Sequence, residues 1–295
     1  MTMTGTKGFL VVDKPKGMTS NQAVGHVRKA TGVEKVGHAG TLDPMATGVL
    51  VMAVGKVTRL IRYIQDEDKE YVATALFGVA TDTLDADGAV LSREPMDFGE
   101  DELMGIVPRF VGTISQVPPM VSALKKDGRR LYELAREGQV VDRDARQVEV
   151  RELEILSVGP PPYPEVEFKV ICGKGTYVRS LADDMAAVLG GDAHLTALRR
   201  TRIGSFRSSD AVTLDDLHNW ERYLIGPAQA MDSLAKVVVD EETARGARHG
   251  MRFVGGPIID GPSDQPYAVL TEDGELIAIY VRVGTRAEPE VVLPS

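Results

Sequence analysis

The chain has 295 residues, of which 43% are hydrophobic and 26% are charged, close to the averages for soluble globular proteins. This length favours one large domain plus a small one. No apolar run approaches the roughly 20 residues that span a bilayer, and the N-terminus lacks a signal-peptide pattern, so we expect a cytoplasmic protein without a membrane span. The single cysteine, Cys172, excludes an intrachain disulfide and supplies no metal cluster.

The net charge of −9 by itself argues against a nucleic-acid partner. The charges are unevenly distributed, however, because residues 1–65 are clearly basic and residues 66–112 are acidic. Local clustering decides phosphate binding, so an acidic protein can still present a basic face to RNA. The alternative is that these lysines and arginines are ordinary solvated surface.

The N-terminal part predicts a strand and a helix joined by a turn. Residues 1–7 have the character of a disordered leader, and residues 8–13 read as a strand. In the turn that follows, Ser20 is the expected N-cap of a helix over 21–31, which a glycine ends.

The next segment, which precedes an apolar run over 49–54, reads Gly37-His38-Ala39-Gly40-Thr41-Leu42-Asp43-Pro44-Met45-Ala46-Thr47-Gly48. We interpret it as a tight loop that enters a buried strand. Glycine lets a flat ligand approach the backbone closely, and Pro44 stiffens the backbone at Asp43, the only carboxylate of the segment. Asp-Pro is also a common turn starter, so the pair alone indicates a turn as readily as a functional acid.

With the Val-Leu that follows it, this segment resembles the catalytic motif of the TruB family, the tRNA pseudouridine-55 synthases. The turn Asp13-Lys14-Pro15-Lys16-Gly17-Met18-Thr19-Ser20 resembles the first motif of the same family, which is credited with holding the catalytic loop; phosphate contact by Lys14 is the less favoured alternative. Further matching segments follow in the expected order, over about the first three quarters of the chain. The resemblance implies the bacterial, stand-alone type of enzyme rather than a guide-dependent relative.

Downstream, strands and helices alternate. We expect helices over 56–64 and 98–110, strands over 70–77, 148–156 and 166–172, and an acidic hairpin loop over 81–88. A strand and turn over 116–130 should lead into a helix through Glu137. A further helix should be opened by 173–181 and end at Gly190. The glycines before that last helix lack Walker spacing, so a nucleotide site there is not supported. Because the strands come in hairpin-like pairs with helices between them, we predict an α+β fold with a central mixed, largely antiparallel sheet, the pseudouridine synthase fold that the resemblance implies.

The resemblance also assigns roles to individual residues. Asp43 is expected to be catalytic, Tyr71 to stack on the target uracil, Tyr177 to line the uridine pocket, Arg179 to pair with the catalytic aspartate, Leu198 to form the pocket wall, and His38 to contact RNA around the flipped nucleotide. Chemistry agrees for the arginine, because a guanidinium beside a buried carboxylate keeps it ionised and fixes its direction. A strand tyrosine is otherwise usually core packing, and an arginine here would otherwise lie on a helix surface.

Basic residues in two of the matching segments are candidates for the RNA backbone. We expect phosphate contacts, which would position RNA without reading its sequence, from Lys125, Lys126, Arg129, Arg130, Arg199 and Arg200. Solvated turn charges are the alternative.

Beyond residue 230 the pattern changes. A strand over 236–239, a helix over 240–249 and a hairpin over 267–280 suggest a small β-rich module. We therefore expect a catalytic domain over 1–230 and a C-terminal domain over 231–295, whose position and pattern resemble the RNA-binding PUA domain. The segment is acidic, which argues against a strong RNA role.

Pseudouridine formation breaks the N-glycosidic bond, rotates the uracil and rejoins it through carbon. Asp43 is the candidate to attack the sugar or the base, or to take a proton from the sugar; the sequence leaves these routes open. No metal or organic cofactor is implied. The target lies in the folded T stem-loop of tRNA, so base flipping and shape recognition are expected. The chain is expected to act as a monomer. The alternative function is a tRNA-binding or tRNA-folding protein whose catalysis is incidental.

Overall fold

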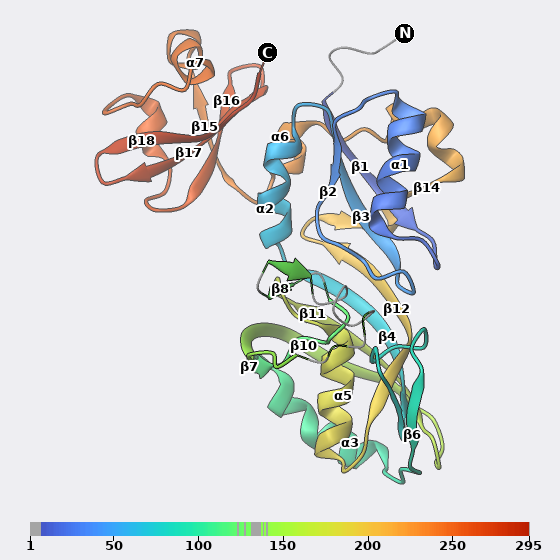
Figure 1. Cartoon of the computed structure of the whole chain (residues 1–295). Coiled ribbons are helices and arrows are strands. Elements are labelled where there is room, and N and C mark those ends of the chain that lie inside the picture. The colour runs from blue at the N-terminus through green and yellow to red at the C-terminus, as the bar shows by residue number, and fades with distance from the viewer. Residues whose placement is uncertain are drawn as a thin grey trace.

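The computed structural model describes residues 7–122, 124–126, 128–130, 137, 139 and 141–294. The expected leader lies outside the described residues except for Lys7, and the helix expected through Glu137 lies largely outside them. Two sheets organise the described part: a large mixed sheet and a separate small sheet near the C-terminus (Figure 1). Within these described ranges, no helix is long and apolar enough to cross a membrane.

The large sheet has ten strands in the described part, with the order β14-β1-β3-β12-β4-β11-β10-β7, while β2 pairs with β3 and β13 with β12. Its strands are β1 (Gly8–Lys14), β2 (Val36–His38), β3 (Thr47–Val54), β4 (Lys69–Phe77), β7 (Gly112–Gln116), β10 (Arg146–Val158), β11 (Glu165–Cys172), β12 (Ala193–Ile203), β13 (Phe206–Arg207) and β14 (Val212–Thr213). Parallel pairing in this sheet is confined, among the described strands, to β1 with β14 and β3 with β12. The predicted mixed, largely antiparallel sheet is therefore confirmed.

The two halves of the sheet meet at a short junction. Strand β3 pairs with β12 only where Arg199 lies opposite Thr47 and Arg200 lies opposite Gly48. One half, with β1, β2 and β3, carries the glycine-rich segment, and the other half is built on β4, β10, β11 and β12 (Figure 1). The loop between β2 and β3 therefore lies where the two halves join.

Helix α1 (Ser20–Thr31) packs against the first half through its buried side chains Ala23, Val24 and Val27. Its N-cap is Thr19, one residue before the predicted Ser20: the Thr19 hydroxyl accepts from the Gln22 amide in a capping box. Gly32 ends the helix with a φ of 67°, as predicted. Ser20 is thereby left free for another role, described below.

The other α-helices in the described part of the large unit are α2 (Ile61–Asp66), α3 (Glu100–Ile106), α5 (Val178–Val188) and α6 (Pro227–Ala230). The helix expected over 98–110 is shorter than predicted, because a 3₁₀ turn over Val107–Phe110 replaces its C-terminal part around Pro108. The acidic loop at 81–88 connects strands β5 (Val79–Thr81) and β6 (Val90–Arg93), as expected for a hairpin. A second small ribbon pairs β8 (Lys125–Lys126) with β9 (Arg129–Arg130).

The C-terminal module contains β15 (Ala235–Val239), α7 (Glu241–Arg248), β16 (Pro266–Thr271), β17 (Leu276–Val283) and β18 (Arg286–Val292), with its four strands in the order β15-β16-β17-β18. Strand, helix and hairpin all follow the pattern predicted from the sequence. One apolar cluster continues from β1 and β3 through Leu60 and Ile64 to Ile279 and Val291 of this module. The small sheet is thus packed onto the large unit on the side of α2 (Figure 1).

Candidate active site

A pocket of about 470 Å³ opens beside the β2–β3 loop. Of the residues predicted to form the site, it is lined by Asp43, Tyr71, Tyr177, Arg179 and Leu198. These residues come from the loop, from β4, from the start of α5 and from β12. The fold therefore brings together side chains that are far apart in the sequence.

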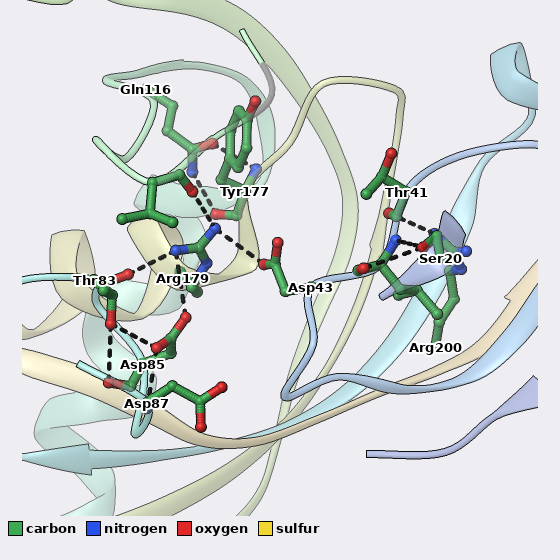
Figure 2. A network of polar contacts seen from close by, with 12 residues as sticks. Ser20, Thr41, Asp43, Thr83, Asp85, Asp87, Gln116, Tyr177, Arg179 and Arg200 are labelled. Carbon is green, nitrogen blue, oxygen red and sulfur yellow. Dashed lines mark hydrogen bonds and ion pairs between the residues drawn. The ribbon is translucent and has the colours of Figure 1, made fainter. Parts of the chain in front are cut away.

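The centre of the pocket is an ion pair. Nη2 of Arg179 lies 3.0 Å from Oδ2 of Asp43. The Arg179 side chain is only 2% exposed, and its Nη1 and Nη2 also donate to the carbonyl oxygens of Thr83 and Val121, each at 2.7 Å. Because fixed carbonyls hold the guanidinium from behind, Arg179 fixes the direction of the Asp43 carboxylate (Figure 2).

A second carboxylate shares this arginine. Oδ2 of buried Asp85, in the β5–β6 hairpin loop, lies 3.4 Å from Nη1 of Arg179. Asp85 is itself held by the Thr83 hydroxyl, at 2.5 Å, and by the backbone amide of Asp87 (Figure 2). Sequence reasoning saw only an acidic hairpin here, and no spacing rule linked Asp85 to the start of α5.

Charge and burial act in opposite directions on Asp43. Loss of hydration, the largest influence, raises the pKa of its carboxyl above the usual range, and Asp85 raises it further. Arg179 lowers that pKa, but not enough to cancel the effect of burial. Arg179 therefore favours the ionised form, in the direction expected from the sequence, while burial and Asp85 oppose it.

Buried polar side chains hold the loop that carries Asp43. The Ser20 hydroxyl accepts from the Leu42 amide at 2.9 Å and donates to the Leu42 carbonyl at 3.2 Å (Figure 2). Lys14 is fully buried, and its Nζ donates to the carbonyls of Pro15 and Met18 at 2.9 and 2.7 Å, with Pro44 at 3.4 Å. Burial lowers the pKa of Lys14 to about 8. Lys14 is thus part of the scaffold, and phosphate contact does not fit its burial.

The glycines of the loop serve packing more than ligand approach. Gly48 has a φ of 100°, and a Cβ there would lie 2.2 Å from the Arg200 carbonyl oxygen of the neighbouring strand. A side chain at Gly37 would meet Cδ1 of Ile61 at 2.9 Å. Of the three glycines in residues 37–48, Gly40 is the one that lines the pocket, and it has a φ of 100°.

The pocket walls are aromatic and aliphatic. Tyr71 is half-buried on β4, burial raises the pKa of its hydroxyl, and the guanidinium of Arg200 lies 6.0 Å from its ring centroid. Leu198 is 7% exposed. Gln116 fixes the backbone of Tyr177 from both sides, accepting from its amide at 2.8 Å and donating to its carbonyl at 3.1 Å. Sequence reasoning missed this role of Gln116.

Comparison with known proteins identifies the family. Residues 28–178 match the family model described as "TruB family pseudouridylate synthase (N terminal domain)", and residues 179–244 match "tRNA pseudouridylate synthase B C-terminal domain". The chain belongs to the TruB family. The resemblance seen in the sequence is therefore confirmed.

Relatives extend this likeness over nearly the whole chain. A protein of Moorella thermoacetica named tRNA pseudouridine synthase B is 42% identical over 96% of this chain and 94% of its own. A protein of Pseudomonas aeruginosa with the same name is 50% identical over 71% of this chain and 68% of its own length. A Cbf5-Nop10-Gar1 complex contains a chain of 26% identity with a TM-score of 0.76, covering 97% of this chain and 85% of that one. The pseudouridine synthase fold is thereby confirmed.

The expected contact between His38 and RNA fits the structure less well. His38 is half-buried on β2 and does not line the pocket as the described residues form it. Burial, followed by the charge of Arg200, lowers the pKa of His38, which favours the neutral ring. Contact between His38 and RNA stays a prediction.

Arg200, predicted to contact the RNA backbone, is held mainly by the protein itself. It is 1% exposed, and its guanidinium donates to the carbonyls of Val49 at 2.8 Å and Gly40 at 3.1 Å, with Thr41 at 3.5 Å. These contacts support the β2–β3 loop. Arg200 also lines the pocket, and its contact with the RNA backbone stays a prediction.

The neighbouring Arg199 is 42% exposed and forms a two-pronged ion pair with Asp13, at 3.1 and 2.7 Å. Arg129 is exposed and pairs with Glu137. The side chains of Lys125, Lys126 and Arg130 lie outside the described residues. RNA contact by Arg199 and by these residues stays a prediction.

Proposed function

We propose that this chain isomerises uridine to pseudouridine at position 55 in the T-loop of tRNA. The observation that carries the proposal is the Asp43–Arg179 pair inside a pocket with Tyr71, Tyr177 and Leu198 on its walls, in a chain of the TruB family. The relatives' name, tRNA pseudouridine synthase B, supports tRNA as the substrate. Position 55 rests on the resemblance of the motifs.

The chemistry suits a lone carboxylate. The bond between N1 of uracil and C1′ of ribose breaks, the base turns, C5 bonds to C1′, and the proton leaves C5 while N1 gains one. Product and substrate contain the same atoms, so no oxidant, reductant or group donor is consumed. In each of the three open routes, attack on the sugar, attack on the base or removal of a sugar proton, Asp43 acts as an ionised carboxylate. Arg179 supports this role by favouring the charged form.

The walls of the pocket fit a base taken out of its stack. An extruded uracil loses the stacking of its neighbours, and the ring of Tyr71 offers a replacement surface beside the Asp43 carboxylate. Leu198 and Tyr177 line the same space. A pocket of about 470 Å³ admits a single nucleotide but not a stacked loop. Base flipping therefore follows from the proposed chemistry.

The RNA outside the pocket is proposed to be the T stem-loop, recognised mainly by shape. We assign residues 1–230 to the catalytic domain and residues 231–295 to a small PUA-like module, whose acidic composition argues against a strong role in RNA binding. Exposed Arg199 and Arg129 lie outside the pocket and are the described candidates for phosphate contact.

The test is to incubate the protein with an unmodified tRNA transcript and to map pseudouridine by carbodiimide treatment and primer extension. A single stop in the T-loop is expected for the wild-type protein. Asp43→Asn, prepared in the same way, is the control for contaminating enzymes and should give no stop. Stops at other positions would contradict the assigned site, and tRNA binding without any stop would favour the tRNA-folding function.

A further inference from the structure

Helix α2 lies between the C-terminal module and strand β2, which leads into the loop that carries Asp43. On one side, Cδ1 of Ile61 approaches Gly37 of β2 so closely that a Cβ there would lie 2.9 Å away. On the other side, the helix residues Tyr63 and Ile64 share an apolar cluster with Ile279 and Val291 of the small sheet. The position of α2 therefore depends on both units.

Polar contacts fix the same helix to strand β18. The Tyr63 hydroxyl donates to Oε2 of Glu290 at 2.7 Å, and Nη2 of Arg62 lies 3.0 Å from the same oxygen. Nη2 of Arg62 also donates to the Tyr63 hydroxyl at 2.6 Å, and the guanidinium lies 4.8 Å from the Tyr63 ring centroid. Tyr63 is 9% exposed, so its hydroxyl is directed at Glu290 and away from bulk water. We call Arg62, Tyr63 and Glu290 the α2 link.

The C-terminal end of α2 reaches the pocket. Gln65 and Asp66 line it, and Oδ1 of Asp66 lies 2.7 Å from Nζ of Lys174 in the loop that precedes Tyr177 and Arg179. Buried Lys69, which also lines the pocket, donates from Nζ to the carbonyls of Gln65 and Glu67 at 2.5 and 2.6 Å. A shift of α2 would therefore move one wall of the pocket and pull on a second.

We propose that the α2 link makes the C-terminal module a positioning element for the catalytic pocket. Glu290 holds α2 through Arg62 and Tyr63, and α2 in turn sets the wall formed by Gln65 and Asp66. The inference rests on the proposed isomerase function and deepens it. In this account the module acts on the reaction even where it touches no RNA.

A matched pair of variants separates this role from general attachment of the module. Glu290→Ala removes the α2 link. Glu275→Ala removes another carboxylate of the same module, which pairs with Lys7 of the large unit at 2.9 Å but makes no contact with α2 among the polar contacts of the described residues. Glu290→Gln keeps an acceptor for the Tyr63 hydroxyl and is the conservative variant.

The measurement is the single-turnover rate and the Kd, with whole tRNA and with an isolated T stem-loop. Glu290→Ala should slow the reaction about fivefold at saturating RNA while Kd stays within about twofold, because a displaced wall affects the reacting geometry more than the overall RNA contacts. The same factor is expected for both RNAs, Glu290→Gln should recover most of the rate, and Glu275→Ala should match the wild type. Equal rates for the two alanine variants, or a loss seen only with whole tRNA, would overturn the inference.

Amide hydrogen exchange gives a readout that does not need activity. Residues 61–66 should exchange faster in Glu290→Ala than in the wild type and in Glu275→Ala, because the helix loses its tie to β18. Unchanged exchange over these residues would contradict the α2 link. Absence of pseudouridine with the wild-type protein would instead count against the proposed function, whatever the exchange shows.

Discussion

Two buried arginines flank Asp43, and they do different work (Figure 2). Arg179 is 2% exposed and Arg200 1% exposed. Arg200 donates to carbonyls of the loop and of β3 and lies near the Tyr71 ring, whereas Arg179 adds two carboxylates, Asp43 and Asp85, to its carbonyl partners. Equal burial therefore does not indicate an equal role. A cation held by carbonyls supports the backbone, whereas one that faces a carboxylate in a pocket also sets the direction and the charge state of that carboxylate.

The sharpest way to test this contrast is at Arg179. Arg179→Lys keeps the charge but loses the planar fork that reaches Asp43, Thr83 and Val121 together. The single-turnover rate should fall about 1000-fold, equivalent to about 4 kcal/mol, because the carboxylate loses its fixed direction. Affinity for tRNA, measured by filter binding, should stay within a few-fold. A rate within about tenfold of the wild type would contradict the role given to Arg179.

At Arg200 the main effect should be on stability. Arg200→Met keeps much of the side-chain volume but leaves the carbonyls of Val49 and Gly40 without their donor. The free energy of unfolding should fall by about 3 kcal/mol, since each buried acceptor left unpaired costs about 1–3 kcal/mol. Urea denaturation measures this. An unchanged midpoint would show that Arg200 does not support the loop.

Asp85 should have a smaller effect than Arg179. Asp85→Asn keeps a similar shape but removes the charge 3.4 Å from Nη1 of Arg179. The guanidinium is then held less firmly, and the single-turnover rate should fall about tenfold, or about 1.4 kcal/mol. Asp82→Asn, in the same hairpin, is the control and should leave the rate near that of the wild type. Equal rates for the two variants would remove Asp85 from the network.

The smallest effect should be a shift in pH dependence. The pKa of Asp43 is raised, and the proposed chemistry uses its ionised form, so the rate should fall as pH drops through that raised pKa. Asp85 contributes to raising it, so in Asp85→Asn the acid limb of the rate profile should move to lower pH. A midpoint that stays in place, or moves upward, would contradict the coupling of the two carboxylates.

The sequence predicted the parts of the site that local patterns encode. The loop with Asp43 is contiguous with a fully buried strand, and the strands and helices around it have clear periodicity. The resemblance of the motifs then predicted that Arg179, Tyr71 and Tyr177 lie near Asp43. Their positions in the sequence alone give no sign of this proximity. The N-cap of α1 is Thr19 and not the predicted Ser20. The Ser20 hydroxyl instead binds the backbone of Leu42, which is a contact between distant segments.

Other parts of the site depend on pairing that the sequence does not show. Arg199 and Arg200 are adjacent on β12, so their side chains point to opposite faces of the sheet, one to solvent and one to the interior. Because the sequence predicts no strand there, the sequence-based prediction assigns both arginines to a basic surface. Asp85 was missed for a related reason, because its partner Arg179 is distant in the sequence and only the docking of the hairpin on β12 brings them together.

The most direct test of the central claim compares two aspartates that each face an arginine. Asp43 pairs with buried Arg179 in the pocket, and Asp13 pairs with exposed Arg199 outside it. Single-turnover rates and tRNA Kd values would be measured for Asp43→Asn and Asp13→Asn. We predict that Asp43→Asn forms no detectable pseudouridine while binding tRNA within a few-fold of the wild type, and that Asp13→Asn reacts within about threefold of the wild-type rate. Retained turnover in Asp43→Asn would contradict the account.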